Sequence, residues 1–436
     1  MLVYNGIVVT VNSKFEVIEN GWVAILNGRI EAVQADDPAA GLPAAVTWID
    51  AKGGIIMPGL VNTHTHLPMT LFRGLADDLP LMEWLNEHIF PAEAKWITPE
   101  SVELGTLLGC AEMLLSGTTT CCDGYFLAEN VANAVKQAGM RAVLGQGVID
   151  FPAPGVPDPT QNVTNAKNYV DAWQGKTPLI TPSIFCHSPY TCSAETLIEV
   201  KKAANAAGVL FQIHGAETKG EVNQIPNGPH RSPVAYLDKL GILDSKTLLV
   251  HGVWIDDIDI EIIAARGTNI SHDPESNMKL ASGVAPVPAL LEAGIWVGLG
   301  TDGCASNNNL DLFGEMDTAA KLHKVMGNDP TLLNAAQVVK MATIYGSKAI
   351  GLSDRIGSLE AGKQADLIIL NSRKPHLAPM YHPESHLVYA ANGADVTHVL
   401  IDGQLVVNNR KITTFDVEQV MAEIVTRYQP GIADLN

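Results

Sequence analysis

The sequence has few positive charges and few charged residues of any kind. Only 17% of its 436 residues are charged, and 28 lysines and arginines stand against 47 aspartates and glutamates, which gives a formal net charge of −19 at pH 7. This deficit of positive charge argues against a nucleic-acid backbone or an anionic membrane surface as partner. It does not restrict a small substrate, because the local charge of a site can oppose the net charge.

Long apolar runs, disulfide patterns and targeting signals are also missing. No segment has the length and purity of a membrane span, and the start, MLVYNGIVVTVNSKFEVIENG, lacks the basic residues and long apolar core of a secretory signal. We therefore expect a cytoplasmic protein with no membrane partner. The six cysteines show no paired spacing of a disulfide framework: Cys110, Cys121, Cys122, Cys186, Cys192 and Cys304.

Both ends of the chain have the pattern of a small β-structure. Residues 1–57 alternate like strands with glycine and asparagine at the turns, and Ala365–Asn371 and Val396–Ile412 show the same pattern. We predict that residues 1–57 and 365–436 pack together as one small β-sandwich module. Residues 58–364 would then form a separate catalytic domain between them.

The middle of the chain alternates short apolar runs with helical patterns, which is typical of an α/β fold with a parallel sheet. We predict a (β/α)8 TIM-like barrel, with an open doubly wound sheet as the structural alternative. No G-x-G-x-x-G follows the first strand to favour a dinucleotide site. The proline-rich segment Asp150–Asn162 is expected to form a loop over the barrel mouth. The expected strands are the run ending at His64, then Thr118–Cys122, Arg141–Val148, Leu179–His187, Val209–His214, Thr247–His251, Thr268–Ser271 and Trp296–Asp302.

Two histidines, His64 and His66, follow the apolar run GGIIMPGLV. A strand has a period of two, so both side chains project to the same side. Two imidazoles at the end of a buried strand are costly unless something satisfies them, and a divalent metal would do so. The alternative is one hydrogen-bonded core histidine and a second histidine in a loop.

Four further strands end in a titratable residue, namely His187, His214, His251 and Asp302. In (β/α)8 enzymes the carboxyl ends of the strands carry the active site. Five of the thirteen histidines fall at this class of position, which isolated structural histidines would rarely do. The pattern predicts a metal at the barrel mouth, with His64 and His66 as its first two ligands.

This set of motifs resembles the amidohydrolase superfamily over nearly the whole chain. The likeness is carried by HTH on the first strand, a histidine at the end of the fifth and sixth strands, GTDG on the eighth, and the late IGSLEAGKQADLIIL. Many two-metal members carry a lysine on strand four, but here TPLITPSIFCHSPY has none. The resemblance therefore implies a mononuclear site holding one Zn²⁺ per chain, with Fe²⁺ as the alternative ion. The implied ligands are His64, His66, His214 and Asp302.

The same resemblance implies the acid–base residues. A bound metal lowers the pKa of a water toward neutrality and so provides hydroxide. Glu217, three residues after His214, would shuttle a proton to a ring nitrogen of the substrate. Asp302 would take the proton of the water, and His251 would orient the hydroxide. The alternative for Glu217 is a solvated loop residue.

The finer match is to the chlorohydrolase and deaminase branch, and especially to the 5-methylthioadenosine/S-adenosylhomocysteine deaminases. It is carried by Pro68–Trp96 and by HSPYTCS. It implies a small-molecule nucleoside substrate, hydrolysed at purine C6 to the inosine product and ammonia. Two carboxylate oxygens suit a vicinal diol, so Glu93 would bind the ribose hydroxyls. The implied substrate-binding residues are Trp84, Glu93, His187, Glu217 and Asp302; without the resemblance, Trp84 and Glu93 would simply belong to an amphipathic helix.

The sequence differs from the family pattern at the residues expected to bind the carboxylate of the substrate. Members of the family that accept S-adenosylhomocysteine hold its carboxylate with arginines around strand three. Here Arg141 starts that strand, Gln146 stands where an arginine is expected, and the next basic residue is Lys167. An unpaired carboxylate in a pocket is costly. We therefore expect 5'-methylthioadenosine to be preferred to S-adenosylhomocysteine, with adenosine as a weaker substrate.

Three rival functions stay open at this point. The first is a deaminase or chlorohydrolase of another N-heterocycle, such as guanine, an 8-oxopurine or a triazine. The second is a non-catalytic scaffold on the same fold, and the third is a two-metal amidase of cyclic amides. The resemblance also implies a homo-oligomer.

Overall fold

The computed structural model describes residues 1–36, 41–225 and 231–433. Within these ranges eight parallel strands form a closed barrel. All eight are buried along nearly their whole length, as expected for strands covered by helices on the outside and filled by side chains inside. They are β6 (Leu60–Thr65), β7 (Thr118–Tyr125), β8 (Arg141–Val148), β9 (Ile180–Cys186), β10 (Phe211–Gly215), β11 (Thr247–His251), β12 (Asn269–His272) and β13 (Val297–Leu299).

The barrel closes where β13 pairs in parallel with β6, through Leu299 and Asn62. This pairing confirms the (β/α)8 prediction and excludes the open doubly wound sheet. Gly300 allows the two strands to approach, since a Cβ atom there would lie 2.1 Å from Asp273 Oδ1 and 2.9 Å from the backbone nitrogen of His64. Strand β13 is shorter than expected because residues 301 and 302 turn away and donate their N–H groups to the carbonyl of His64.

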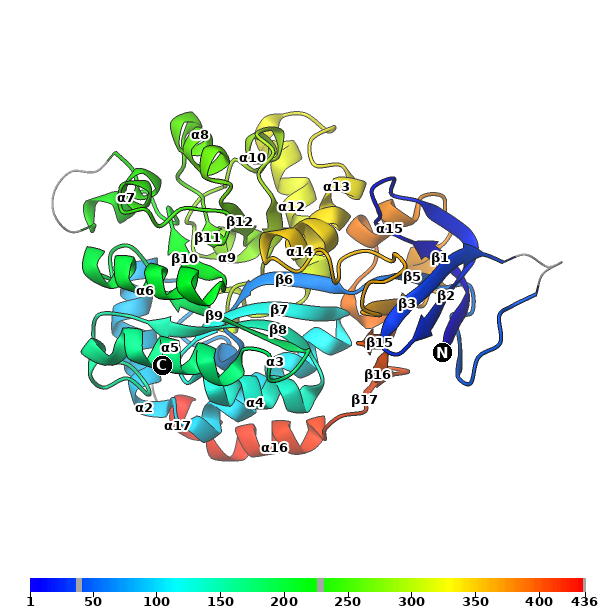
Figure 1. Cartoon of the computed structure of the whole chain (residues 1–436), viewed down its shortest axis with the longest axis horizontal. Helices are drawn as coiled ribbons and strands as arrows, with labels where there is room; N and C mark the ends of the chain where they lie inside the picture. Colours follow the sequence, from blue (N-terminus) through cyan, green and yellow to red (C-terminus); the bar gives the residue numbers. More distant parts are fainter. Residues whose placement is uncertain (37–40, 226–230, 434–436) are drawn as a thin grey trace.

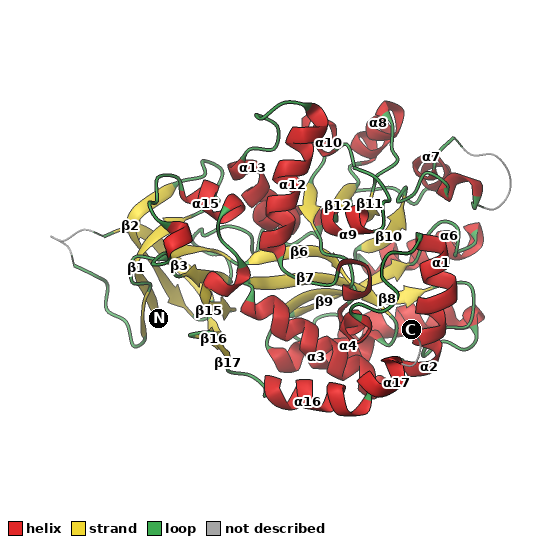
Figure 2. Cartoon of the chain, turned by 180° about the vertical axis from the view of Figure 1, so that it is seen from behind, coloured by secondary structure: helices red, strands yellow, loops and turns green. Residues whose placement is uncertain are grey.

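Helices cover the outside of the barrel (Figure 2). Their ends carry ordinary stop and start signals; for example, Thr98 caps the first long helix, and Gly139 and Gly208 end two others in the left-handed conformation. The barrel helices are α3 (Pro99–Leu115), α4 (Ala128–Ala138), α5 (Asn162–Trp173), α6 (Ala194–Ala207), α7 (Pro233–Lys239), α8 (Asp257–Arg266), α9 (Pro274–Lys279), α10 (Val287–Glu292), α11 (Cys304–Asn307), α12 (Leu312–Gly327), α13 (Ala335–Lys340) and α14 (Gly346–Ala349).

Strands from the two chain ends lie side by side at one end of the barrel (Figure 1). In the described residues they form one nine-stranded sheet, and both halves supply side chains to a separate core that includes Val8, Ile25, Leu367 and Leu400. The order along the sheet is β17 (Lys411–Ile412), β16 (Gln404–Asn408), β15 (Val396–Ile401), β14 (Leu367–Leu370), β5 (Ile55–Pro58), β1 (Leu2–Val9), β2 (Val17–Leu26) and β3 (Arg29–Ala35), with β4 (Trp48–Asp50) beside β1.

The last helices run along the outside of the barrel (Figure 1): α16 (Val417–Arg427) lies beside α3, and α17 (Gln429–Ala433) follows it, with Gly431 against the ring of Trp96. Arg427 forms an ion pair with Glu100 at the start of α3, and the rings of Tyr428 and Trp96 are 6.5 Å apart. The division of the chain into an end module, 1–57 and 365–436, and a barrel domain, 58–364, stays a prediction. Within the described ranges, none of the helices combines the length and apolar character needed to span a membrane.

A short helical segment covers the barrel mouth between β6 and α3. It consists of the 3-10 turn η1 (Leu67–Phe72), α1 (Leu81–Glu83), the π-helical η2 (Trp84–Ile89) and α2 (Phe90–Trp96). The predicted loop Asp150–Asn162 is confirmed as a loop up to a turn at Pro159–Gln161, and Asn162 begins α5. Phe151 lies against Phe90, with ring centroids 5.3 Å apart, so the loop starts beside this segment.

Candidate active site

A cavity opens at the carboxyl ends of the barrel strands. Eight of the nine residues singled out from the sequence line it, and the ninth, His64, lies buried directly beside them. The structure therefore brings together residues from the first, fourth, fifth, sixth and eighth barrel strands and from the covering segment. The eight are His66, Trp84, Glu93, His187, His214, Glu217, His251 and Asp302.

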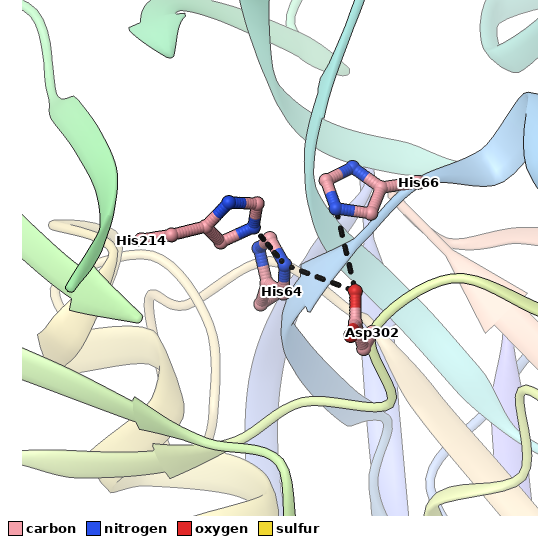
Figure 3. Close-up of side chains that lie close together, drawn as sticks. All are labelled: His64, His66, His214 and Asp302. Carbon is pink, nitrogen blue, oxygen red and sulfur yellow. Dashed lines mark hydrogen bonds and ion pairs between the residues drawn. The ribbon is translucent and has the colours of Figure 1, made fainter. Parts of the chain in front are cut away.

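The first group consists of three histidines and one aspartate whose side chains converge (Figure 3). One ligand atom from each lies within 4.8 Å of every other. Asp302 Oδ1 is 3.3 Å from Nε2 of His64 and 3.3 Å from Nε2 of His66. On the other side, Nε2 of His214 is 3.1 Å from Nε2 of His64.

Burial keeps these imidazoles neutral. It lowers the pKa of His64 to about 3, although the hydrogen bond to Asp302 opposes this, and it lowers the pKa of His214 well below its usual value. Neutral imidazole is the form that binds metals. Nδ1 of His66 lies 2.6 Å from the carbonyl of Gly124, to which it donates, so Nε2 remains as the free lone pair. Three nitrogens and one carboxylate oxygen form a donor set that suits a divalent metal.

The Asp302 carboxylate is oriented by groups that the sequence did not reveal. Oδ2 accepts hydrogen bonds from the hydroxyls of Ser276, at 2.8 Å, and Ser306, at 2.7 Å, while the N–H of Gly303 donates to Oδ1. Burial raises the pKa of Asp302, but its hydrogen bond to His64 and its proximity to His66 outweigh burial and hold the pKa well below the usual range. Asp302 is thus an anion with one oxygen aimed at the histidines.

Glu217 lies near the same group but in a different environment. It follows β10 after Ala216, whose positive φ of 55° turns the chain back toward the cavity, and it is 7% exposed. The solvated-loop alternative is therefore wrong. Burial first, and then the charge of Asp302, raise the pKa of Glu217 to about 8. Oε2 of Glu221 accepts the N–H of Glu217 at 2.8 Å and so fixes the turn.

His251 connects Glu217 to a third carboxyl group. It ends β11 with a positive φ of 74°. Its Nε2 is 3.8 Å from Oε2 of Glu217, and its Nδ1 is 3.5 Å from Oδ2 of Asp273. Asp273 is fully buried just after β12 and was not recognised from the sequence. The imidazole therefore lies between two carboxyl groups and beside His214, with ring centroids 5.2 Å apart.

The remaining predicted residues form the outer part of the cavity. Glu93, on α2, accepts a 2.5 Å hydrogen bond from the hydroxyl of Tyr125, a residue that the sequence analysis missed. Burial raises the pKa of Glu93 to about 7, and the Tyr125 hydroxyl partly opposes this. His187 follows β9 and pairs through Nδ1 with Thr191 Oγ1 at 2.9 Å. Trp84 begins η2 and is 6% exposed.

The position at which the family resemblance places a carboxylate-binding arginine does not face the active cavity. Gln146 accepts the N–H of Ala128 and borders a neighbouring polar cavity with Tyr169 and Trp173, not the one described above. Arg141 lies at the opposite end of β8, where it binds both carboxylate oxygens of Asp366. Among the described residues that line the active cavity there is no lysine or arginine.

Known proteins resemble the chain over its whole length. A match to the family described as "Amidohydrolase family" covers residues 55–406. A 5-methylthioadenosine/S-adenosylhomocysteine deaminase from Syntrophobacter fumaroxidans is 49% identical over 424 residues, 97% of this chain and 96% of the relative. A 5'-deoxyadenosine deaminase from Methanosarcina acetivorans is 44% identical over 439 residues, 100% of this chain and 99% of the relative.

A solved structure shares the fold closely. It is an adenosine deaminase from Xanthomonas campestris with bound zinc, which has a TM-score of 0.95, is 40% identical, and matches 99% of this chain and 98% of its own. These similarities confirm the family resemblance drawn from the HTH, strand-end histidine and GTDG motifs. The chain belongs to the amidohydrolase family.

Proposed function

We propose that the protein is a metal-dependent deaminase that hydrolyses the C6 amino group of 5'-methylthioadenosine, giving 5'-methylthioinosine and ammonia. One observation carries the proposal: a single cavity joins the three-histidine, one-aspartate group to a buried acid, Glu217, and to a second buried carboxyl group, Glu93. The names of the relatives, which are deaminases of adenosine derivatives, support the reaction class.

The ligands proposed for the metal are His64, His66, His214 and Asp302, and the ion is one Zn²⁺ per chain, with Fe²⁺ as the alternative. Two features of the site fit such an ion: Nε2 of His64 and Nε2 of His214 lie 3.1 Å apart, and Asp302 supplies a carboxylate oxygen beside them. A divalent metal held there supplies activation of the attacking water. The zinc of the Xanthomonas campestris adenosine deaminase supports this choice of ion.

The chain's own residues move the protons. Glu217 is proposed to donate its proton to a ring nitrogen of the purine, which makes the neighbouring carbon more electrophilic. Asp302 takes a proton from the water and passes it to the departing amine, which leaves as neutral ammonia, and the proton of the newly added C6 hydroxyl returns to Glu217 as the carbonyl forms. His251, placed between Glu217 and Asp273, orients the water by hydrogen bonding.

The outer cavity is proposed to bind the nucleoside. Glu93 would accept the ribose hydroxyls, Trp84 would pack against an apolar face, and His187 would contact the substrate. The described lining carries no cation, so the carboxylate of S-adenosylhomocysteine would remain unpaired there. A neutral, apolar 5' group suits the lining better, and a relative named 5'-deoxyadenosine deaminase supports the same preference.

The rival functions are less well supported. Guanine, 8-oxopurines and triazines offer no ribose to Glu93. A two-metal amidase would require a lysine on strand four, which this chain lacks. A non-catalytic scaffold would not need four converging metal ligands beside two titratable groups. A homo-oligomeric enzyme is proposed from the family resemblance alone, and a cytoplasmic location stays the expectation drawn from the sequence.

The decisive experiment measures ammonia release by purified, metal-replete protein. The substrates are 5'-methylthioadenosine, 5'-deoxyadenosine, S-adenosylhomocysteine, adenosine and guanine, compared by kcat/KM. We expect the first two to exceed S-adenosylhomocysteine by at least about tenfold, the factor that about 1.4 kcal/mol produces. Equal use of S-adenosylhomocysteine would contradict the preference, and inactivity on every nucleoside would refute the assignment.

A further inference from the structure

Glu93 and Tyr125 form an isolated buried pair at the outer part of the cavity. The Tyr125 hydroxyl donates a 2.5 Å hydrogen bond to Oε1 of Glu93. Both residues line the cavity, and they are 4% and 5% exposed. Burial and the adjacent carboxylate raise the pKa of Tyr125 well above its usual value, so the phenol keeps its proton and acts as the donor.

This contact leaves the two oxygens of Glu93 in different situations. Oε1 is occupied by the phenol, whereas no hydrogen bond from the described residues reaches Oε2. Hydrogen bonds to a carboxylate are stronger than bonds between neutral groups, and an ionised carboxylate can accept about four of them. Oε2 therefore remains free to accept hydrogen bonds from the hydroxyl groups of a molecule in the cavity.

Tyr125 also ties a helix outside the barrel to the barrel wall. Glu93 belongs to α2 in the covering segment, whereas Tyr125 is the last residue of β7. The Tyr125 ring is 6.2 Å from the ring of His66, so one side chain spans the distance between the proposed metal group and Glu93. Removal of its hydroxyl would keep this ring contact but free the carboxylate to rotate and to be hydrated.

From this arrangement we infer that Tyr125 is a positioning residue for ribose recognition. Its hydroxyl holds Oε1 of Glu93 and thereby directs Oε2 toward the ribose diol, which sets the preference for ribonucleosides over dideoxynucleosides. The inference rests on the ribose role proposed for Glu93 above. It concerns a residue that acts through Glu93 and not one that takes part in the chemical step.

The test compares two substrates that differ only in the diol, adenosine and 2',3'-dideoxyadenosine. Ammonia release gives kcat and KM for the wild-type protein, Tyr125→Phe, Glu93→Gln and the double variant. We expect Tyr125→Phe to lower the kcat/KM ratio of adenosine to dideoxyadenosine about tenfold, through a higher KM for adenosine at nearly constant kcat. Dideoxyadenosine itself should be used equally well by both proteins.

The double variant identifies the route of the effect. With a glutamine at 93, the phenol would hold the amide oxygen, and an NH₂ group would replace the acceptor Oε2. Glu93→Gln should therefore lower the ratio at least as much as Tyr125→Phe. Adding Tyr125→Phe to Glu93→Gln should change the ratio by less than about twofold, because the two residues act as one unit.

A second tyrosine of the same cavity supplies a matched control. Tyr190 also lines the cavity, and its ring lies 6.4 Å from the ring of His187. Tyr190→Phe should leave the ratio unchanged, whatever it does to the absolute rates. Metal content and the thermal midpoint of each variant show whether the fold and the metal group are intact.

Two outcomes would overturn the inference while the ribose role of Glu93 stands. In one, Glu93→Gln abolishes the preference but Tyr125→Phe keeps it within about twofold of wild type. In the other, Tyr125→Phe slows both substrates equally, which is the signature of a purely structural role. A Glu93→Gln variant with an unchanged ratio would refute the ribose role itself, and the inference with it.

Discussion

Replacing Glu217 by glutamine gives the sharpest test of the proposed chemistry. The exchange keeps the shape and the hydrogen-bonding capacity of the side chain but removes the transferable proton. Burial and the charge of Asp302 raise the pKa of Glu217 to about 8, so the side chain keeps its proton to a higher pH than an ordinary carboxyl group does. The native side chain can therefore act as a proton donor, whereas the glutamine of the variant has no acidic proton to donate.

The expected loss follows from the geometry. Positioned proton transfer contributes about 10²- to 10⁴-fold, equivalent to about 3–5.5 kcal/mol of transition-state stabilisation. In the described cavity lining, the other buried carboxyl groups have different partners: Asp302 faces the histidines, and Glu93 binds Tyr125. Neither is placed to replace Glu217, so we expect the full loss, measured as kcat for 5'-methylthioadenosine at pH 7.

The pH profile adds an independent prediction. A carboxyl group with a raised pKa is protonated below that pKa and loses its proton as the pH rises through it. The wild-type rate should therefore fall about tenfold per pH unit above about pH 8, and this limb should disappear in Glu217→Gln. The amount of bound metal should be the same in the variant and in the wild-type protein.

Glu221→Gln is the matched control. Glu221 lies four residues further along, and its Oε2 accepts the N–H of Glu217. A glutamine there keeps a carbonyl acceptor, so the turn and most of the activity should survive. The reasoning is refuted if Glu217→Gln, with a full complement of metal, turns over within a few-fold of wild type.

Three further predictions test the surroundings of the site. His64→Ala should lose both the metal, by elemental analysis, and the activity; stoichiometric metal would contradict the ligand set. Ser306→Ala removes a 2.7 Å hydrogen bond to Asp302 and should weaken metal binding about 10- to 100-fold in chelator competition, whereas unchanged affinity would count against it. Arg141→Met leaves Asp366 buried and unpaired and should cost about 3–5 kcal/mol in denaturant unfolding; a smaller cost means that water reaches the carboxylate.

Much of the site could be predicted from the sequence because its signals are local. A polar residue at the end of an apolar run identified His187, His214, His251 and Asp302, and the barrel topology then brings such ends together. The same rule would have identified Tyr125, but its strand, TTTCCDGY, is rich in threonine and was expected to end at Cys122. The last residue of a buried strand is hard to recognise from the sequence when the strand is not clearly apolar.

The rest of the site depends on contacts that no local pattern shows. Ser276 and Ser306 reach Asp302 from two different short helices, α9 and α11, and serine is too common at such positions to signal a role. Gln146 was expected to occupy the place of a carboxylate-binding arginine of the family, but its side chain faces the neighbouring cavity. The face of the sheet on which a strand residue lies depends on the register of the strand, and a shift of one residue moves its side chain to the opposite face.

Two carboxyl groups in one cavity have opposite environments, and this difference assigns their roles. Asp302 accepts hydrogen bonds from two serine hydroxyls and a backbone N–H, and the hydrogen bond to His64 together with the adjacent His66 holds its pKa low despite burial, so it is the permanent anion. Glu217 has one long hydrogen bond from Ser282, and both its burial and the charge of Asp302 keep it protonated. The two groups are linked, since the negative charge of Asp302 helps to keep the proton on Glu217. Pairs of titratable groups with pKa values driven apart in this way mark acid and base in one site, and a hydrolytic deamination requires both.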